Sequence, residues 1–105
     1  SSTLLRGPGG LLMDVERRSV TVADIPIELT RLEFDLLHRL LINRGRVLTR
    51  ERLLEQAWGY DYVGDTRAVD SAVKRLRAKL RQAAPEADCI ESVRGLGYRI
   101  NQTQL

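Results

Sequence analysis

The fold of this chain is decided by one stretch, residues 65–82, which read DTRAVDSAVKRLRAKLRQ. Its apolar residues recur three and four positions apart, which is the period of an amphipathic helix. The side expected to be buried carries Val69, Ala72, Val73, Leu76, Leu80 and Ala83. The opposite side carries Arg67, Ser71, Lys74, Arg75 and Ala78. The stretch therefore predicts one long helix that packs against a core on one side and is basic on the other.

Positive charge is concentrated on this stretch. Six basic residues and one acid, Asp70, lie between Thr66 and Arg81, which gives a local net charge of +5, against +3 for the whole chain. Small residues between the charges, Ser71 and Ala78, allow a close approach to a large anion, and the major groove of duplex DNA admits a helix. Charged helix faces are also commonly just solvated. The helix alone leaves both interpretations open.

Length and composition indicate one folded domain. The chain has 105 residues, enough for one modest core. Its pI near 9.5 favours polyanionic partners. The single cysteine, Cys89, cannot form an internal disulfide and fits a reducing compartment. No apolar run approaches the roughly 18 residues of a membrane span and no secretory signal pattern is present, so we expect a cytoplasmic protein without a membrane partner.

The N-terminal third is predicted to form a small sheet. Residues 1–10, which contain a Gly-Pro-Gly-Gly run, are expected to be a linker or an artificial remnant, and the domain is expected to span residues 11–105. Val20 and Val22 alternate with polar residues, and a turn is expected at residues 23–24. Pro26 cannot donate a ladder hydrogen bond, so its strand is expected at an edge. We expect an antiparallel sheet with one solvated face.

Two capped helices are predicted before the basic one. Thr30 and Glu33 fit a capping box, in which each side chain bonds the backbone N–H of the other residue. This first helix is expected to stop near Gly45. Thr49 is placed to cap a second, shorter helix. The apolar faces of the two helices are expected to hold Phe34, Leu37, His38, Leu40, Leu41, Leu53, Leu54, Ala57 and Trp58.

A loop and a hairpin are predicted on either side of the basic helix. Residues 59–64 form a loop, after which Asp65, or alternatively Thr66, is expected to cap the helix; Pro85 is expected to end it. Two short alternating stretches then flank residues 95–97, Gly-Leu-Gly, and predict a β-hairpin with Arg94 beside its turn. This Gly-x-Gly precedes a strand and lacks a third glycine, so it does not indicate a dinucleotide site.

The order of these elements is that of a winged helix-turn-helix, an α+β fold. From about Leu11 to Ile100 the chain resembles the DNA-binding effector domains of the OmpR/PhoB class of bacterial two-component response regulators. The resemblance rests on Leu29-Thr30-x-x-Glu33-Phe34-x-Leu36-Leu37, Gly45-Arg46-Val47-Leu48-Thr49-Arg50-Glu51-x-Leu53-Leu54, Trp58-Gly59-Tyr60, Arg67-x-Val69-Asp70, Leu76-Arg77-x-Lys79-Leu80 and Val93-Arg94-Gly95-x-Gly97-Tyr98-Arg99.

The resemblance implies a four-stranded N-terminal sheet, three helices and a C-terminal hairpin wing. It implies that the long helix enters the major groove of DNA and that the wing reaches the minor groove. It also implies an upstream phosphorylatable receiver domain with its sensor kinase, and pairing of two domains on direct repeats of DNA. The family often has a DNA-facing histidine at the position of Ala72, which implies that this contact is absent here.

The residues expected to contact DNA are Arg50, Trp58, Arg67, Ser71, Lys74, Arg75, Arg77, Arg94 and Tyr98. The resemblance implies that the loop with Tyr60, Asp61 and Tyr62 contacts RNA polymerase in some members, although loop packing is an equal alternative for the tyrosines. Arg77 and Lys79 could instead be structural, paired with Asp70 or an acid of the sheet. Trp58 could be core, and Arg94 could pair with Glu91.

Two other functional classes are weighed against DNA binding. A winged helix used for protein contacts, with the basic helix on an acidic partner, is the main alternative. An enzyme is not expected, because one histidine, one cysteine and no carboxylate pair or metal-ligand spacing are present. A lone helical histidine among leucines, such as His38, is far more often structural than catalytic. No catalytic residue, metal or cofactor is therefore expected.

Overall fold

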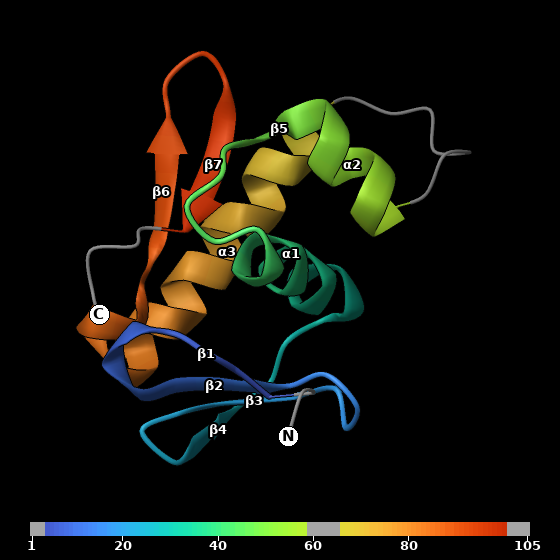
Figure 1. Ribbon diagram of the computed structural model, residues 1–105. Coiled ribbons are helices and arrows are strands. Elements are labelled where there is room, and N and C mark those ends of the chain that lie inside the picture. The colour runs from blue at the N-terminus through green and yellow to red at the C-terminus, as the bar shows by residue number, and fades with distance from the viewer. Residues whose placement is uncertain (1–3, 59–65, 101–105) are drawn as a thin grey trace.

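The computed structural model describes residues 4–58 and 66–100 (Figure 1). Its elements are β1 Leu4–Arg6, η1 Pro8–Gly10, β2 Leu11–Asp14, β3 Ser19–Val22, β4 Ile25–Ile27, α1 Arg31–Ile42, β5 Leu48–Thr49, α2 Arg50–Trp58, α3 Arg67–Ala83, η2 Pro85–Ala87, β6 Ile90–Val93 and β7 Gly97–Ile100. This order confirms the predicted α+β winged helix-turn-helix. None of the helices in the described ranges has the length and apolar character that crossing a membrane requires.

The N-terminal sheet has the order β1-β2-β3-β4, with every pair antiparallel. Met13 and Val22 point inward and are completely buried. The two-residue turn between β3 and β4 has positive φ at Ala23 and Asp24, which confirms the predicted turn. Pro26 lies in β4 at the edge of the sheet, where its missing N–H leaves no gap in the ladder between strands.

The prediction that residues 1–10 are a linker is wrong for the described part of that segment. Leu4–Arg6 form β1, in which Leu5 lies opposite Met13 of β2. The backbone N–H of Gly7 donates to the carbonyl oxygen of Leu11 at 2.9 Å, which folds the chain back onto β2. Three residues are too few to show an alternating pattern, so only the pairing with β2 identifies the strand.

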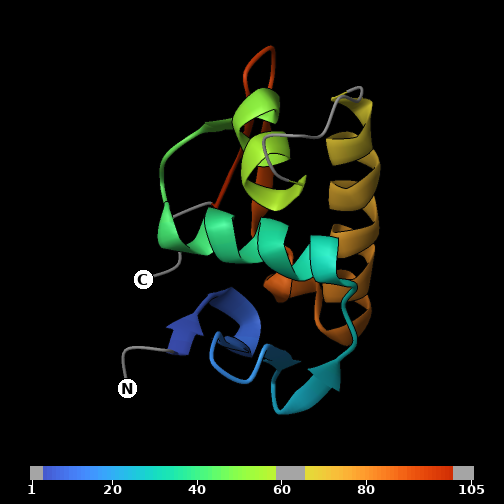
Figure 2. The ribbon, with the colours of Figure 1, turned by 90° about the vertical axis from the view of Figure 1, so that its right-hand side faces the viewer.

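Helix α1 lies between the N-terminal sheet and the layer formed by α2 and the hairpin (Figure 2). The predicted capping box is confirmed: the Thr30 N–H donates to Glu33 Oε1 at 3.0 Å, and the Glu33 N–H donates to Thr30 Oγ1 at 3.2 Å. Phe34, Leu37, Leu40 and Leu41 are buried as expected, and His38 is half-buried. Leu36, which lies on another side of the helix, is buried as well. Burial on several sides makes α1 the central element of the core.

The hairpin belongs to a three-stranded sheet of order β5-β7-β6. The predicted pair β6–β7 is confirmed. The strand β5 was not predicted, because two residues carry no periodic signal; Leu48 pairs with Tyr98 and Thr49 with Gly97. The Thr49 hydroxyl accepts a hydrogen bond from the Arg52 N–H at 3.1 Å, which confirms the predicted cap of α2. The start of α2 and the hairpin are therefore joined through one short ladder.

Helix α3 has the two predicted faces. The buried residues on it are Val69, Ala72, Val73, Leu76 and Leu80. The residues of the opposite side, Arg67, Ser71, Lys74, Arg75 and Ala78, are exposed. The helix ends at Ala83, before Pro85, as predicted. Thr66 precedes it without a side-chain cap bond, and the predicted cap Asp65 lies outside the described residues.

Ala72, at the position where the resemblance implies that the family often has a DNA-facing histidine, lies on the buried side of α3, as the apolar period predicts. Ala72 is completely buried, because it follows Val69 by three residues and precedes Leu76 by four, on the same side of the helix. A larger side chain at this position would meet the core. The identity of residue 72 therefore bears on packing.

Candidate nucleic-acid interface

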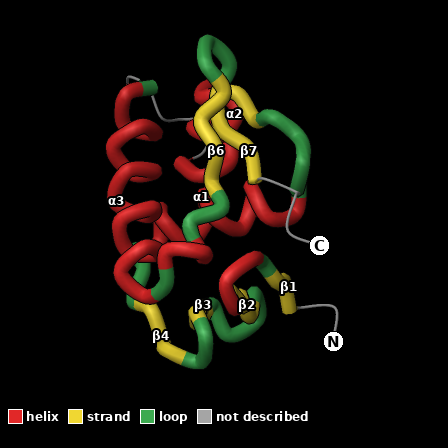
Figure 3. Tube along the Cα trace, turned by 90° about the vertical axis from the view of Figure 1, so that its left-hand side faces the viewer, coloured by secondary structure: helices red, strands yellow, loops and turns green. Residues whose placement is uncertain are grey.

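The exposed side of α3 and the tip of the hairpin define the candidate interface. The N-terminal end of α3 and the turn between β6 and β7 lie at the same end of the molecule (Figures 1 and 3). The turn is narrow: the Leu96 N–H donates to the Val93 carbonyl oxygen at 3.0 Å, and Gly95 has a φ of +78°. Arg94 is exposed at this tip. The two elements thus offer cations to the same side of the molecule.

Arg94 does not make the alternative ion pair with Glu91. Glu91 instead accepts a hydrogen bond from Arg99 across the hairpin. No charged partner of Arg94 lies within residues 4–58 and 66–100. Its guanidinium therefore projects from the tip as an available cation. Leu96, beside it, is 55% exposed and was not singled out in the sequence.

At least four of the six cations of α3 hold carboxylates of the same chain. Arg77 Nε lies 3.1 Å from Asp88 Oδ1, and Arg81 Nε donates to Asp88 Oδ2. Arg75 Nε and Lys79 Nζ approach Glu33 at 3.4 Å and 2.6 Å. Lys74 is exposed and makes no ion pair with the described residues. The positive charge on the interface is therefore smaller than the local net of +5 suggests.

These pairings bear on two of the predicted contacts. Arg77 is partnered with Asp88, which lies between η2 and β6, and not with Asp70 or an acid of the N-terminal sheet as the structural alternative had it. The Arg77 side chain is 31% exposed, so most of it is unavailable to a ligand. Arg75 is 58% exposed and uses one of its donor atoms for Glu33, which leaves its other N–H groups for a partner.

Glu33 has a second role beyond the cap of α1. Its side chain is completely buried and joins the cap of α1 to Arg75 and Lys79 of α3. Burial alone raises the pKa of its carboxyl, but hydrogen bonds from Lys79, the Thr30 N–H and Arg75 outweigh burial and lower the pKa below its usual value. The carboxylate thus orients two cations of α3. The capping pattern indicated only its local role.

Acid is expected to destabilise the protein partly through Glu33. Because its pKa is lower in the folded chain, the unfolded chain takes up this proton first as the pH falls. The stability from Glu33 is therefore present above its usual pKa of 4.5 and is lost as the pH falls through the folded-state pKa. Glu33→Gln keeps a capping side chain but removes the charge, and should lower the free energy of unfolding at pH 7 by about 1–3 kcal/mol.

Urea unfolding of both proteins at several pH values measures this effect. Glu33→Gln should also flatten the fall in stability below about pH 5. Glu91→Gln is the matched control, because its pair with Arg99 is exposed on both sides and exposed pairs contribute only about 0–1 kcal/mol. Equal losses for the two variants would contradict the role of Glu33.

Arg50 and Tyr98, two predicted contacts, meet at Asp70. Arg50 Nε and the Tyr98 hydroxyl both donate to Asp70 Oδ1, at 2.8 Å and 2.5 Å, and the Arg50 guanidinium lies 5.3 Å from the centre of the Tyr98 ring. The hydrogen bond that Arg50 donates to Asp70 raises the pKa of Arg50, and burial together with the interaction with Asp70 raises the pKa of Tyr98. Tyr98 is only 7% exposed, and its hydroxyl is used in the hydrogen bond to Asp70. The sequence did not indicate this role of Asp70.

The remaining predicted residues lie as follows. Trp58 ends α2 and packs partly against the core. Tyr60, Asp61 and Tyr62 lie outside the described residues. His38 is half-buried with its ring 6.3 Å from that of Phe34, and burial raises the pKa of Cys89 to about 11. Within the described ranges, no three His, Cys, Asp or Glu side chains gather as metal ligands would.

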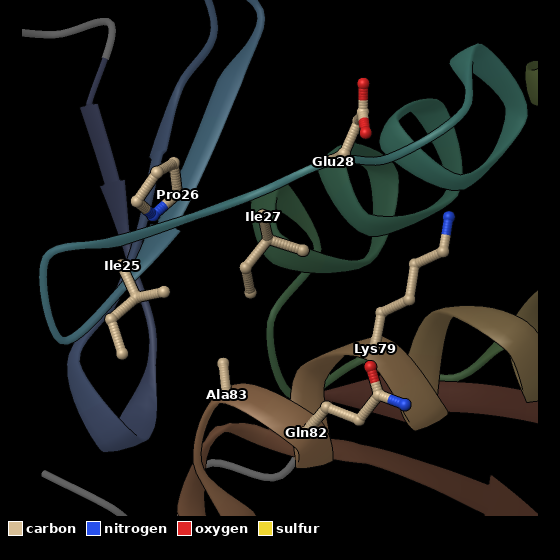
Figure 4. A pocket seen from close by; sticks show the side chains of 7 residues that line it. All are labelled: Ile25, Pro26, Ile27, Glu28, Lys79, Gln82 and Ala83. Atoms are coloured by element: carbon tan, nitrogen blue, oxygen red, sulfur yellow. The ribbon is translucent and has the colours of Figure 1, made fainter.

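A separate hollow lies between β4 and the C-terminal half of α3 (Figure 4). Ile25, Ile27 and Ala83 line its apolar part, and Lys79 stands at its edge. Ile25 is 52% exposed there. The hollow lies toward the opposite end of α3 from the wing tip and does not belong to the candidate interface (Figure 1).

Comparisons with known proteins agree with this geometry. Residues 24–100 match the family described as "Transcriptional regulatory protein, C terminal". The chain is 50% identical over 92 residues to the sensory transduction protein RegX3 of Mycolicibacterium smegmatis, which covers 88% of this chain and 40% of RegX3. It is 42% identical to the response regulator ArlR of Staphylococcus saprophyticus, over 89% of this chain and 42% of ArlR. The chain thus spans about two fifths of these relatives.

Solved structures give the same picture. The RstA DNA-binding domain of Klebsiella pneumoniae, solved in complex with the RstA box, has a TM-score of 0.77 and 34% identity, covering 92% of this chain and 96% of that one. The DNA-binding domain of CpxR from E. coli has a TM-score of 0.80 and 28% identity, covering 93% and 95%. Both matches extend over nearly the whole length of the chains compared.

Proposed function

Because this chain belongs to the family of C-terminal domains of transcriptional regulatory proteins, in the OmpR/PhoB class of response regulators, we propose that α3 and the wing bind duplex DNA together. The chain is the DNA-binding output domain through which a two-component system regulates transcription. The observation that carries the proposal is that the N-terminal end of α3 and the turn between β6 and β7 lie at one end of the molecule. This turn contains the exposed Arg94.

Helix α3 is the element that enters the major groove. Ser71, Lys74 and Arg75 face outward on it, and the groove is wide enough for a helix. An arginine such as Arg75 can bond a guanine edge with two N–H groups, whereas a lysine such as Lys74 acts as a point charge on phosphate. Arg50 is 30% exposed at the first turn of α2, where helix N-termini meet phosphate.

The wing is suited to the minor groove. That groove is too narrow for a helix but admits a single long side chain, and arginine is favoured where A·T-rich sequence narrows the groove further. Arg94 projects from a tip that Gly95 keeps slim. The wing would therefore read the shape of the sequence beside the site of α3. The related domains support DNA binding in general, since RstA was solved with the RstA box and AdeR with an intercistronic region.

The whole protein is proposed to contain more than this domain. The similar response regulators are more than twice as long, which supports an upstream receiver domain that a sensor kinase phosphorylates. We also propose a cytoplasmic location, two domains on direct repeats of DNA, and a contact of residues 60–62 with RNA polymerase. The family resemblance supports these last proposals.

DNA binding is expected to depend steeply on salt. If about four to six phosphates are neutralised per domain, log K should fall against log salt with a slope of roughly −4 to −5. Fluorescence anisotropy with a duplex selected from a random pool measures the slope. Lys74→Ala should reduce the magnitude of the slope by about 1. Arg17 is 84% exposed and remote from α3, so Arg17→Ala should leave the slope unchanged. A slope near zero, or no binding at low salt, would favour the protein-contact function instead.

Arg94→Ala is expected to weaken DNA binding unequally on different flanks. The loss should be greater, by a factor of about 10, on a duplex with an A·T tract beside the site of α3 than on one with a G·C flank, because the narrow groove strengthens the arginine contact. Two duplexes that differ only in the flank measure this effect, with Arg17→Ala as the control. The same loss on both flanks would show that Arg94 does not read groove shape.

A further inference from the structure

We propose that Asp70 is a positioning residue for DNA recognition, which fixes the register along the duplex between the contacts of α3 and those of the wing. The inference rests on the proposed function, because it concerns how two parts of one DNA-binding surface are held relative to each other. It assigns to Asp70 no contact with DNA. Asp70 acts through Tyr98 and Arg50.

The geometry joins three elements at one oxygen atom. Asp70 Oδ1, on the first turn of α3, accepts hydrogen bonds from Arg50 Nε at the start of α2 and from the Tyr98 hydroxyl on β7. These partners are 20 and 28 residues away in the chain. The Arg50 guanidinium also lies over the Tyr98 ring, so the two partners contact each other. The cluster therefore connects all three elements that face DNA.

Besides the packing of Ile90, Tyr98 and Ile100 in the common core, the wing is joined to the rest of the interface by a backbone ladder that leads into α2. Strand β7 pairs with β5, which is two residues long and leads directly into α2, while β6 forms the outer edge of the sheet. The hairpin extends beyond this ladder toward its tip (Figures 1 and 3). The hydrogen bond from Tyr98 to Asp70 connects β7 directly to α3. Tyr98 lies four residues after Arg94 in the chain. A small movement at Tyr98 would thus be magnified at the tip.

The negative charge of Asp70 suits it to hold Tyr98 and Arg50 by hydrogen bonds. It is the one acid between Thr66 and Arg81, and its side chain is 40% exposed on a surface that is proposed to meet phosphates. A carboxylate there opposes DNA binding by charge repulsion. A charged acceptor makes stronger hydrogen bonds than a neutral one, and the buried phenol of Tyr98 donates to this carboxylate at 2.5 Å. Asp70 is therefore suited to holding its neighbours, and not to contacting DNA.

The test uses the duplex that wild-type protein selects from a random pool, and versions with one or two base pairs inserted between the site of α3 and the A·T flank. Tyr98→Phe removes only the hydroxyl and keeps the ring in the core. Asp70→Asn removes the charge. Glu91→Gln is the control, because it breaks an ion pair on the same hairpin that does not involve α3. Thermal unfolding of each variant verifies that it is folded at the binding temperature.

One inserted base pair is expected to lower the DNA affinity of wild type and of Glu91→Gln by about 10-fold or more, which is the size of a typical mismatch effect. The same insertion should lower the DNA affinity of Tyr98→Phe and Asp70→Asn by less than about 3-fold, because a wing that is not bonded to α3 can shift with the displaced A·T flank. The ratio between spacings is the readout, since a purely structural role lowers affinity equally at every spacing. An unchanged ratio in Tyr98→Phe, or no spacing preference in wild type, overturns the inference. If wild type selects no duplex, the proposed function itself fails.

Discussion

Leu76→Ala is expected to lower the free energy of unfolding by about 2–5 kcal/mol, because truncation of a buried leucine removes its packing and leaves a cavity. Leu76 is completely buried at the middle of the core face of α3, next to Val73 and Leu80. Loss of this size is a large share of the roughly 5–15 kcal/mol that stabilises a typical domain. Because Leu76 faces away from the interface, DNA binding should fall only in proportion to the unfolded fraction.

Denaturant unfolding, with DNA binding measured well below the melting temperature, tests this expectation. Leu96→Ala provides a matched control, since it is the same substitution at a leucine that is 55% exposed. Its effect on stability should stay within about 0.5 kcal/mol. Similar effects of the two substitutions on stability would show that the orientation of α3 is wrong.

Gly97→Ala is expected to destabilise the wing by about 3 kcal/mol, at the upper end of overpacking effects. A Cβ atom at Gly97 would collide with the carbonyl oxygen of Leu48 and would lie only 2.9 Å from Thr49 Cα. These are backbone atoms of β5, so no side-chain movement can relieve the collision. The alanine must separate β7 from β5, and with it the wing from the start of α2. Loss of DNA affinity should therefore accompany the loss of stability.

Gly95→Ala separates this collision from the general effect of replacing a turn glycine. Gly95 has a φ of +78°, but an added Cβ would have no atom within 4 Å. The substitution should cost about 1 kcal/mol for the left-handed conformation alone. Thermal unfolding and anisotropy on the selected duplex compare the two variants. A Gly97→Ala protein as stable as Gly95→Ala would contradict the close approach of β7 to β5.

The parts of the fold and of the interface that the sequence predicted are those that local patterns encode. The two faces of α3, the cap at Thr30 and the hairpin around Gly95 follow from periods and caps that extend over a turn or two of chain. The structure confirms each of them. The roles of individual cations were harder to predict: Arg77 was named as a contact, but its partner Asp88 is held near it only by the turn through η2.

By itself, then, the sequence determined the class of fold and which side of each helix is buried, because apolar periodicity is a local property. Only the tertiary structure decided which side chains far apart in the chain meet. It placed Leu4–Arg6 beside β2, Glu33 beside residues 42 and 46 positions away, and Asp70 beside Arg50 and Tyr98. Apolar periodicity predicts that a residue is buried, but it does not predict which residues it contacts. Hydrogen bonds and close packing act only over a few ångströms, so partners distant in the chain appear only once the core has brought their elements together.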